Sequence, residues 1–332
     1  MHVVRLVGLV FFLFGVPTLG WDPHAVRGVS WYGMETEIQN LEGLNVFDVE
    51  THMDRMSHFG FNTLRLPFAM EGVLSGVYEN NGAYDTLHKV FQSAERYPMG
   101  VILDLHRLFF HTTSPLWHSS LAVHHVSNTE ETVVLSETNV LRGWKDLLDR
   151  FSFYPSLLGI DLYNEPHGEA SFHTGNKSTD FQLFIERAMQ ELNVSFFFAT
   201  GIHWGQDMRS YSHLPESYRS RLVLSPHVYG PTVSTMEKDD WKTDPSILVY
   251  RWNTYFGYLD TMGWTVVIGE FGASQYSTED MLWLSYFVDY LRQRNMGWIF
   301  WAWNPWSHDV QGFLQGDWKT PVPEKWRLLS SL

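Results

Sequence analysis

The amino-acid sequence predicts a single-domain α/β protein with the architecture of a (β/α)8 TIM barrel. Short apolar runs alternate along the chain with segments in which apolar residues recur at helical spacing. No linker, low-complexity tract or run of charge divides residues 21–332, which favours one domain. Eight strand–helix units in that length would average about 39 residues each, which suits this barrel.

Eight apolar runs are expected to form the parallel strands of the barrel. They cover residues 26–31, 63–67, 100–105, 158–163, 196–200, 222–225, 265–269 and 298–303. A doubly wound open sheet is the alternative arrangement of such units. However, no G-x-G-x-x-G sequence follows the first strand, so a dinucleotide-binding fold has little support.

Helical periodicity is clearest in three segments between these strands. Met53, Met56 and Phe59 recur at helical spacing before Gly60, a residue type that commonly ends helices. The two other apolar stripes consist of Leu141, Trp144, Leu148 and Phe151, and of Phe181, Phe184, Ile185, Ala188 and Leu192. We interpret all three stripes as packing faces without a functional role.

The composition excludes several classes of function. The formal net charge is -14, so the chain lacks the basic surface with which proteins bind nucleic acid, whereas a neutral substrate is compatible with it. The absence of cysteine excludes disulfide bonds and a zinc site built from thiolates. Aromatic residues make up 16% of the chain and include 15 tryptophans, whose flat rings suit the C–H faces of sugars.

Residues 1–20 have the pattern of a secretory signal peptide. Arg5 supplies a positive charge, residues 6–16 are apolar apart from glycine, and Gly20 is a small residue that suits a cleavage position. The apolar run is shorter than the roughly 20 residues needed to span a membrane. We therefore expect a secreted, extracellular protein that is a monomer and has no membrane anchor after cleavage.

Polar and charged residues stand at the ends of six of the predicted strands, where the active site of such a barrel lies. They include Arg65, Asp104, His106, Asn164, Glu165, His227, Tyr229, Glu270 and Trp303. Each has a simpler explanation when it is taken alone, because Glu270 could belong to a turn and a histidine is more often a satisfied core residue. Their joint position at one end of one barrel favours a site, since charged groups are costly to bury without purpose.

Two carboxylates at strand ends are the groups that a glycosidase needs. We expect Glu165 to act as the acid/base and Glu270 as the nucleophile of a retaining mechanism, with the two carboxyl groups about 5–5.5 Å apart. Arg65 would lower the pKa of Glu270, whose negative charge would in turn raise the pKa of Glu165. Asn164 would bind the sugar 2-hydroxyl, and Tyr229 would donate a hydrogen bond to Glu270.

The remaining candidates would bind and orient the substrate. His106 and His227 are expected to hold sugar hydroxyls or orient neighbouring groups, and Trp303 to form the floor under the sugar that is cut. Candidate platforms for further sugars, each weighed against packing in the core, are Trp31, Trp117, Trp204, Trp241 and Trp306. His124-His125 has no partner at metal-ligand spacing, so we interpret this pair as part of a loop and predict no metal and no cofactor.

With these residues in place, the sequence resembles glycoside hydrolase family 5. Asn164-Glu165-Pro166 is similar to the acid/base motif of that family, and the segment around Glu270, residues 268–272, is similar to its nucleophile strand. The positions that match the family's other site residues are Arg65, His106, His227, Tyr229 and Trp303. The similarity extends from about Arg27 to about Leu314.

Within that family the chain looks most like the cellulase-type endoglucanases. Residues 28–36, 116–118 and 303–309 resemble their first strand, their long loop after the third strand, and their last strand with its loop. The resemblance implies cleavage of internal β-1,4 bonds in a β-glucan polysaccharide. Mannan, xylan or β-1,3-glucan as substrate, and a non-catalytic carbohydrate-binding barrel, are the alternatives. Related endoglucanases often carry a disulfide, but this chain has Glu37 and Ala170 in those neighbourhoods.

Overall fold

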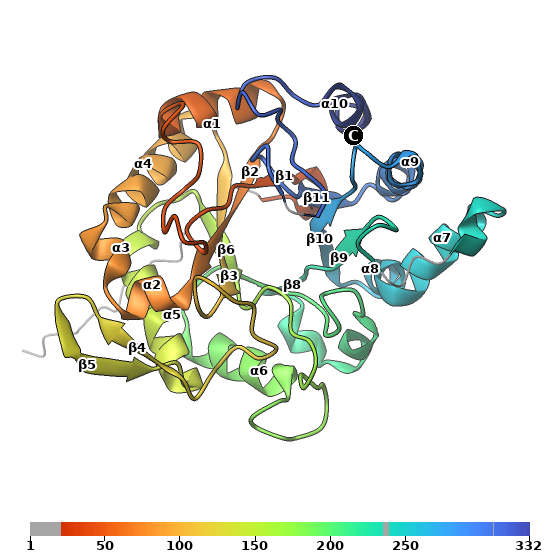
Figure 1. Ribbon diagram of the computed structural model, residues 1–332. Coiled ribbons are helices and arrows are strands. Elements are labelled where there is room, and N and C mark those ends of the chain that lie inside the picture. Colours follow the sequence, from red (N-terminus) through yellow and green to blue (C-terminus); the bar gives the residue numbers. More distant parts are fainter. Residues whose placement is uncertain (1–20, 235–238, 308) are drawn as a thin grey trace, which may run out of the picture.

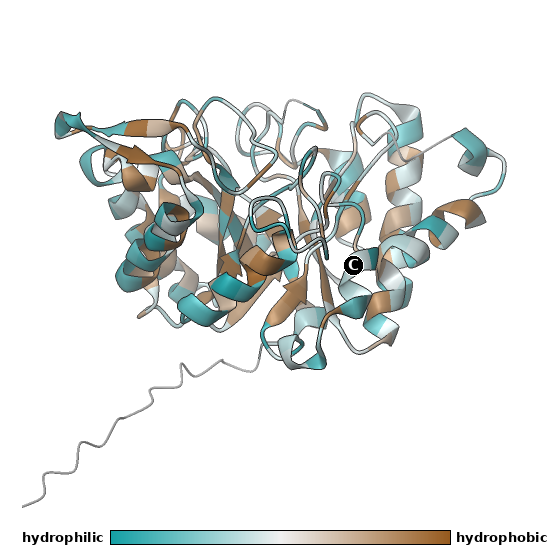
Figure 2. Cartoon of the chain, turned by 90° about the horizontal axis from the view of Figure 1, so that it is seen from below, coloured by the Kyte–Doolittle hydropathy of each residue, from teal (hydrophilic) through white to brown (hydrophobic). Residues whose placement is uncertain are grey.

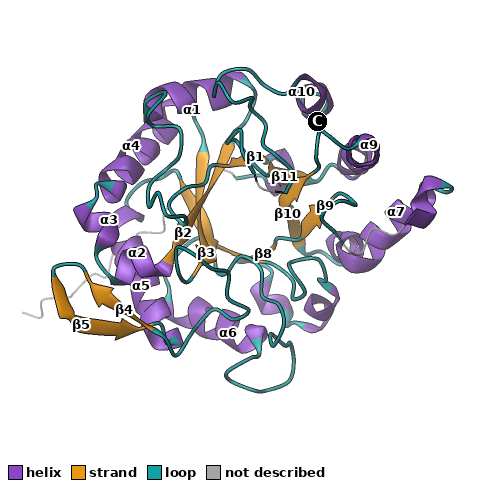
Figure 3. Ribbon diagram, in the orientation of Figure 1, coloured by secondary structure: helices purple, strands orange, loops and turns teal. Residues whose placement is uncertain are grey.

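The computed structural model describes residues 21–234, 239–307 and 309–332, and the predicted signal peptide lies outside this range. Eight parallel strands of the described chain close into a barrel (Figures 1 and 3). They are β1 (Arg27–Ser30), β2 (Thr63–Ala69), β3 (Gly100–Arg107), β6 (Leu157–Asp161), β7 (Phe196–Ala199), β8 (Leu222–Leu224), β10 (Thr265–Gly272) and β11 (Gly297–Phe300). Pairing of β10 with β11 and of β11 with β1 completes the ring, so the predicted barrel is confirmed and the open-sheet alternative is wrong.

Helices surround the barrel (Figure 3). The α-helices are α1 (Val49–His58), α2 (Met70–Leu74), α3 (Val77–Asn80), α4 (Ala83–Arg96), α5 (Glu137–Phe151), α6 (Phe181–Glu191), α7 (Ser246–Trp252), α8 (Tyr258–Thr261), α9 (Thr278–Arg294) and α10 (Pro323–Leu329). Shorter turns of helix are η1 (Pro23–Ala25), η2 (Arg209–His213), η3 (Glu216–Tyr218), η4 (Asp239–Lys242) and η5 (Asn253–Gly257). No helix in the described part of the chain combines the length and the apolar character needed to cross a membrane.

The helices begin and end where local side-chain chemistry favours it. The Asp48 side chain accepts a hydrogen bond from the Thr51 N–H at 2.8 Å and caps the start of α1. After the C-terminal end of α1, Gly60 adopts a φ of 84°, a left-handed conformation that glycine adopts without steric cost. Met53 and Met56 are fully buried, as the predicted apolar stripe requires. The hydropathy colouring shows the same division, with brown strands inside and teal on the outer helices (Figure 2).

Three strands were not predicted from the sequence. β9 (His227–Tyr229) follows β8 directly and pairs with the end of β10, where His227 lies opposite Glu270. An antiparallel hairpin of β4 (Ala122–His125) and β5 (Asn128–Val134) projects from the side of the barrel (Figure 1). The interpretation of His124-His125 as a loop is therefore wrong, because both residues pair with β5. Only Val123 of β4 is buried, so the apolar alternation that would have revealed this strand is short.

Period-2 alternation along the strands decides which side chains point into the barrel. A small apolar cluster of Val26, Ile102, Phe198, Val223, Val267 and Ile299 occupies positions at or near the first three residues of the strands. Ile102, Asp104 and His106 share one face of β3, so the inward positions change from apolar to polar toward the carboxyl ends. The much larger second core packs between the strands and the surrounding helices. Polar groups are thereby gathered at one end of the barrel.

Candidate active site

A cleft of about 530 Å3 opens at the carboxyl ends of the strands. It is lined by Tyr32, Glu35, Thr36, His106, Arg107, Thr113, Asn164, Glu165, Trp204, Gln206, Tyr229, Val233, Glu270, Trp301, Ser307, Asp309 and Val310. A groove of about 620 Å3 lies on the outer surface against α4 and α5, where Arg150 is already paired with Glu79. The cleft at the strand ends holds both predicted catalytic glutamates, so it is the candidate active site.

A single guanidinium organises the floor of this cleft. The side chain of Arg65, on β2, is fully buried and reaches three carboxylates on three other strands. Its Nη2 atom lies 3.1 Å from Asp104 and 3.0 Å from Asp161, and its Nη1 atom lies 2.5 Å from Glu270. Arg65 Nη2 also donates to the side-chain oxygen of Asn164 at 2.9 Å. Burial raises the pKa of Asp104 and of Asp161 to about 7. Arg65 opposes this rise but does not cancel it, because its single positive charge is shared among several acids.

Glu270 is held as a carboxylate. Burial alone would raise its pKa, but His227, Arg65, His106 and a hydrogen bond from Tyr229 together lower it to about 2. The Tyr229 hydroxyl donates to Oε2 at 2.6 Å, while Arg65 contacts Oε1. An ionised carboxylate with both oxygens oriented is suited to nucleophilic attack.

Glycine is required immediately before this residue. A Cβ atom at Gly269 would lie 2.0 Å from the Ser225 hydroxyl and 3.2 Å from Nε2 of His227. A larger residue would therefore push β10 away from the segment that carries His227 and Tyr229. The glycine in this position lets the strand bearing Glu270 approach its neighbours closely.

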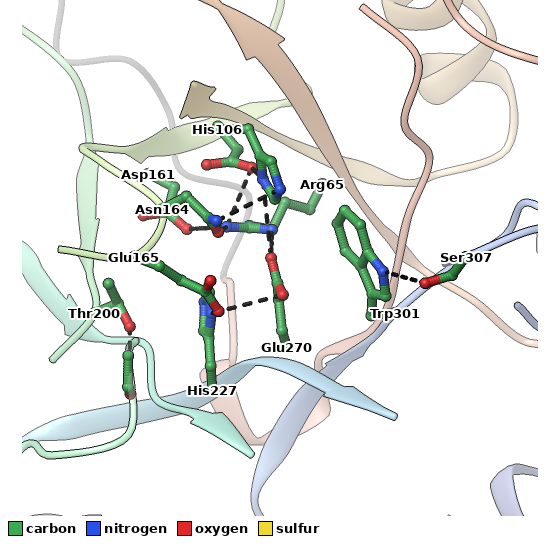
Figure 4. Close-up of polar contacts among 12 residues, drawn as sticks. Arg65, His106, Asp161, Asn164, Glu165, Thr200, His227, Glu270, Trp301 and Ser307 are labelled. Atoms are coloured by element: carbon green, nitrogen blue, oxygen red, sulfur yellow. Dashed lines mark hydrogen bonds and ion pairs between the residues drawn. The ribbon is translucent and has the colours of Figure 1, made fainter. Parts of the chain in front are cut away.

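Glu165 lies four residues beyond the end of β6, and its pKa is shifted in the opposite direction from that of Glu270. Burial and the negative charge of Glu270 raise its pKa, while the neighbouring His227 opposes the rise. His227 Nδ1 lies 2.8 Å from Oε1 of Glu165 and 3.6 Å from Oε2 of Glu270, so this ring bridges the two acids (Figure 4). Oxygens of the two glutamates lie within 4.8 Å of each other. The two carboxyl groups therefore face one another closely enough to act on the same glycosidic bond, and the retaining separation of about 5–5.5 Å between them stays a prediction.

His106 and Asn164 complete the polar wall beside Glu270. Burial lowers the pKa of His106, which keeps the ring neutral, and its Nδ1 lies 2.7 Å from Asp104. Nε2 of this ring then accepts from the Asn164 amide at 3.4 Å. Because the Asn164 oxygen already faces Arg65, its NH2 group is the part left to donate to a substrate hydroxyl.

The predicted floor of the site must be corrected. Trp303 is fully buried, its Nε1 donates to His52, and it packs against Phe313 with ring centroids 5.9 Å apart. Trp301 lines the cleft instead, with its ring parallel to His106 at 5.1 Å and its Nε1 donating to Ser307 at 3.0 Å. β11 ends at Phe300, so the alternation that points Ile299 and Trp301 inward does not continue to Trp303.

The other predicted tryptophan platforms divide into two groups. Trp31, Trp117 and Trp241 are fully buried in the core, so their assignment to the cleft is wrong. Trp204 lines the cleft, is 46% exposed and stacks on His167 with centroids 3.6 Å apart. Trp204 and the residue before it both have a φ of 61°, a costly conformation that clusters at functional sites.

Trp306 is 63% exposed and stands on the loop after β11, outside the residues that line the cleft. Its neighbour Ser307 does line the cleft, so Trp306 stays a candidate platform. The sequence reasoning gave no role to Tyr32, Glu35 and Arg107, which do line the cleft. All three stand at or shortly after the ends of β1 and β3, so the same strand-end rule could have identified them.

Two clusters in the site have the spacing of metal ligands. They are Asp104, His106 and Glu270, and Glu165, His227 and Glu270. Arg65 and Tyr229 already bind the two oxygens of Glu270, and the chemistry of two carboxylates needs no metal. The absence of a catalytic metal and of a cofactor stays a prediction.

A (β/α)8 barrel with two buried glutamates whose closest oxygens lie within 4.8 Å, and whose pKa values are shifted in opposite directions, is typical of a glycoside hydrolase. The comparison with protein families supports this class, because the sequence model of the family 'cellulase (glycosyl hydrolase family 5)' matches residues 24–307. The chain belongs to this family.

Known relatives support the assignment over nearly the whole chain. An endoglucanase of Paenibacillus polymyxa is 29% identical over 328 residues, which cover 89% of this chain and 79% of the relative. The major extracellular endoglucanase of Xanthomonas campestris pv. campestris is 29% identical and the match covers 92% and 67% of the two chains. An endocellulase from Pyrococcus horikoshii, solved with cellotetraose, superposes with a TM-score of 0.80 at 28% identity and covers 92% of each chain.

Proposed function

We propose that this protein is a retaining endo-β-1,4-glucanase that cleaves cellulose-like polysaccharide. The observation that carries the proposal is the pair of glutamates, which lie within 4.8 Å of each other and whose pKa values are shifted in opposite directions. The similarity to endoglucanases and to an endocellulase solved with cellotetraose supports glucan as the substrate.

In the first step Glu270 attacks the anomeric carbon and Glu165 gives its proton to the leaving oxygen. The low pKa of Glu270 keeps the nucleophile ionised, and the raised pKa of Glu165 favours the protonated form of the acid. Attack on the face opposite the leaving group gives a covalent glycosyl-enzyme with inverted configuration.

In the second step Glu165 takes a proton from water, which attacks the anomeric carbon and releases Glu270. Esterification removes the negative charge of Glu270, so the pKa of Glu165 falls and its carboxylate becomes available as the base. Two inversions restore the β configuration in the product.

The residues around the two glutamates stabilise the sugar during the reaction. The Asn164 amide would donate to the sugar 2-hydroxyl, a bond that strengthens in the oxocarbenium-like transition state. Tyr229 would hold Glu270 in line, and the indole of Trp301 would support the sugar ring.

Internal cleavage requires that the polysaccharide pass through the site on both sides. Exposed indoles stand on two different loops at the carboxyl ends of the strands, Trp204 after β7 and Trp306 after β11. This arrangement favours endo action on a polysaccharide chain.

The extracellular Xanthomonas relative and the apolar residues 6–16 support secretion directed by residues 1–20. We also infer that the protein is a monomer and has no nucleic-acid partner.

The test is release of reducing sugar from carboxymethylcellulose, β-mannan, xylan and laminarin by the wild type and by Glu270→Ala. Carboxymethylcellulose should be cut best, and the variant should lose at least about 10³-fold, as expected for a covalent nucleophile. Glu37→Gln, an exposed carboxylate outside the cleft, is the control and should retain activity. Preference for another glycan with the same loss would change the substrate, and binding without turnover would favour the non-catalytic barrel.

NMR of the first product tests the stereochemical claim. The β anomer should form before mutarotation, because two displacements retain configuration. Initial formation of the α anomer would overturn the double-displacement mechanism.

A further inference from the structure

The loops that follow β9 and β10 meet at a buried carboxylate outside the cleft. Asp280 lies in the first turn of α9 and is fully buried. We propose that Asp280 is a positioning residue of the reaction, which ties these two loops together and thereby fixes Tyr229 against Glu270. This role rests on the proposed function, because Glu270 is the nucleophile only in that function.

The Asp280 carboxylate binds both loops through three hydrogen bonds. Its Oδ1 accepts from the Thr232 N–H at 3.0 Å and its Oδ2 from the Thr232 hydroxyl at 2.6 Å, so it holds the loop after β9. Oδ2 also accepts from the Ser274 N–H at 2.7 Å, so the same group holds the loop after β10. Hydrogen bonds to a carboxylate are stronger than bonds between neutral groups, and three of them make a firm junction.

This use of Asp280 differs from ordinary helix capping. The Asp280 N–H donates at 3.1 Å to the hydroxyl of Ser277, which caps the start of α9. A glutamate or glutamine at the position of Asp280 commonly reaches back to the N–H of the capping residue. In this chain the Ser277 N–H donates instead to the Ser274 carbonyl at 3.2 Å, so the carboxylate of Asp280 is left for the two loops.

The position of Tyr229 depends on this junction because β9 is short. The strand has three residues and lies at the edge of the sheet, next to β10. Immediately after it, a Cβ atom at Gly230 would lie 3.0 Å from Cγ of Asp280 and 3.1 Å from its Oδ1, a close approach that glycine permits. The carboxylate therefore supports the backbone next to Tyr229, whose hydroxyl donates to Oε2 of Glu270 at 2.6 Å.

The second loop links this junction to the nucleophile and to a third loop of the cleft. Ser274 stands two residues beyond the end of β10, the strand that carries Glu270. Its hydroxyl donates at 3.1 Å to the side-chain oxygen of Gln311, on the loop whose carbonyls bind the ammonium of Lys325. Burial lowers the pKa of Lys325 to about 7, and the negative charge of Asp280 opposes this fall. One network thus joins the loops after β9, β10 and β11.

Loss of the Asp280 carboxylate should slow attack by Glu270 more than it weakens substrate binding. The described residues that line the cleft do not include Asp280, so its removal deletes no contact with the sugar. Tyr229 would lose the support of its following loop, and the Glu270 oxygens would move out of line with the anomeric carbon. A displacement of about 1 Å at the reacting atoms can lower a rate by about 10²-fold.

The experiment measures attack by Glu270 directly, with 2,4-dinitrophenyl 2-deoxy-2-fluoro-β-cellobioside. Glu270 forms a bond to the anomeric carbon and dinitrophenolate leaves with the bonding electron pair, so this step needs no proton from Glu165. The fluorine slows the second step and the glycosyl-enzyme accumulates. The amount of dinitrophenolate released therefore counts the folded active sites, while the rate of its release reports how well the nucleophile is placed.

For Asp280→Ala, the rate of release at saturating substrate should fall by about 10-fold to 100-fold. The amount released per folded protein and the substrate concentration for half-maximal rate should change little. Thr232→Val removes one donor to Asp280 at nearly constant side-chain volume, so it should slow release in the same direction by a smaller factor. This second variant decides the question if Asp280→Ala does not fold.

Glu279→Gln is the matched control, because it removes a carboxylate from the same turn of α9. The Glu279 side chain is 57% exposed and pairs with Lys242, and this variant should react as fast as the wild type. A wild-type rate per active site in Asp280→Ala would overturn the positioning role, even if fewer sites react, and would assign Asp280 to the stability of the fold alone. If the wild type itself releases no dinitrophenolate, the proposed function has failed and the role of Asp280 fails with it.

Discussion

Replacing Glu270 with glutamine is expected to lower the pKa of Glu165, because the substitution removes a negative charge next to that carboxyl group. Burial and the negative charge of Glu270 both raise the pKa of Glu165, and the substitution removes only the charge. The closest oxygens of the two groups lie within 4.8 Å. At that distance and an effective dielectric constant of about 20, Coulomb's law gives roughly 3.5 kcal/mol for the repulsion that the substitution removes, and one pKa unit corresponds to about 1.4 kcal/mol.

The sign of this shift is what the reaction requires. A protonated Glu165 is needed in the first step, so kcat/KM of the wild type should fall as the pH rises through its raised pKa. Glutamine imitates the esterified nucleophile, because it keeps the shape of the side chain and carries no charge. The lower pKa in the variant therefore measures the change that turns Glu165 from acid to base between the two steps.

The assay is a carbon NMR titration of protein labelled at the glutamate carboxyl carbons, from about pH 4 to pH 9. Glu165→Gln assigns the resonance by its disappearance, and Glu37→Gln serves as the control that should leave the titration in place. A fall of less than about half a unit in Glu270→Gln would refute the reasoning. Burial would then account for the raised pKa without a contribution from the nucleophile.

Three further substitutions test other parts of the structure. Trp303→Ala should lower the free energy of unfolding by about 3–5 kcal/mol, because the indole is fully buried. Trp301→Ala should instead reduce kcat/KM with a much smaller fall in Tm, because this indole lines the cleft. A loss of activity without loss of stability in Trp303→Ala would restore Trp303 as the floor. Lys325→Met removes the donor that binds the carbonyls of residues 310–312, so urea unfolding should show a loss of about 2–3 kcal/mol, and unchanged stability would contradict this role. Trp204→Ala should raise KM for cellotetraose about 10-fold with little change in Tm, and an unchanged KM would remove it from the site.

The sequence was sufficient to predict the barrel and the polar residues at its mouth. Parallel strands place their carboxyl ends together, so Arg65, Glu165 and Glu270 could be brought to one site although they are far apart in the chain. Period-2 alternation also explains why Asp104 and His106 face the same interior.

Prediction failed where a strand ends and its periodicity no longer applies. Trp303 was assigned to the cleft because β11 was expected to continue to that residue, but the strand ends at Phe300 and Trp301 takes the place. Glu35 lies five residues beyond β1, and its burial depends on the loop conformation that Gly33 fixes. Apolar content alone could not separate buried Trp117 from exposed Trp204, since indole rings serve cores and sugar platforms equally.

Arg65 contacts acids from both halves of the barrel, so dividing or recombining the barrel would separate paired charges. Arg65, Asp104 and Asp161 belong to the first half of the chain, whereas Glu270 comes from the second. A fragment that ends after β6 would keep one cation facing two acids, and the complementary fragment would carry Glu270 without its guanidinium. In each half, buried carboxylates would lack part of the positive charge that pairs with them in the intact barrel. A chimera must therefore exchange Arg65 and its three acids as one set.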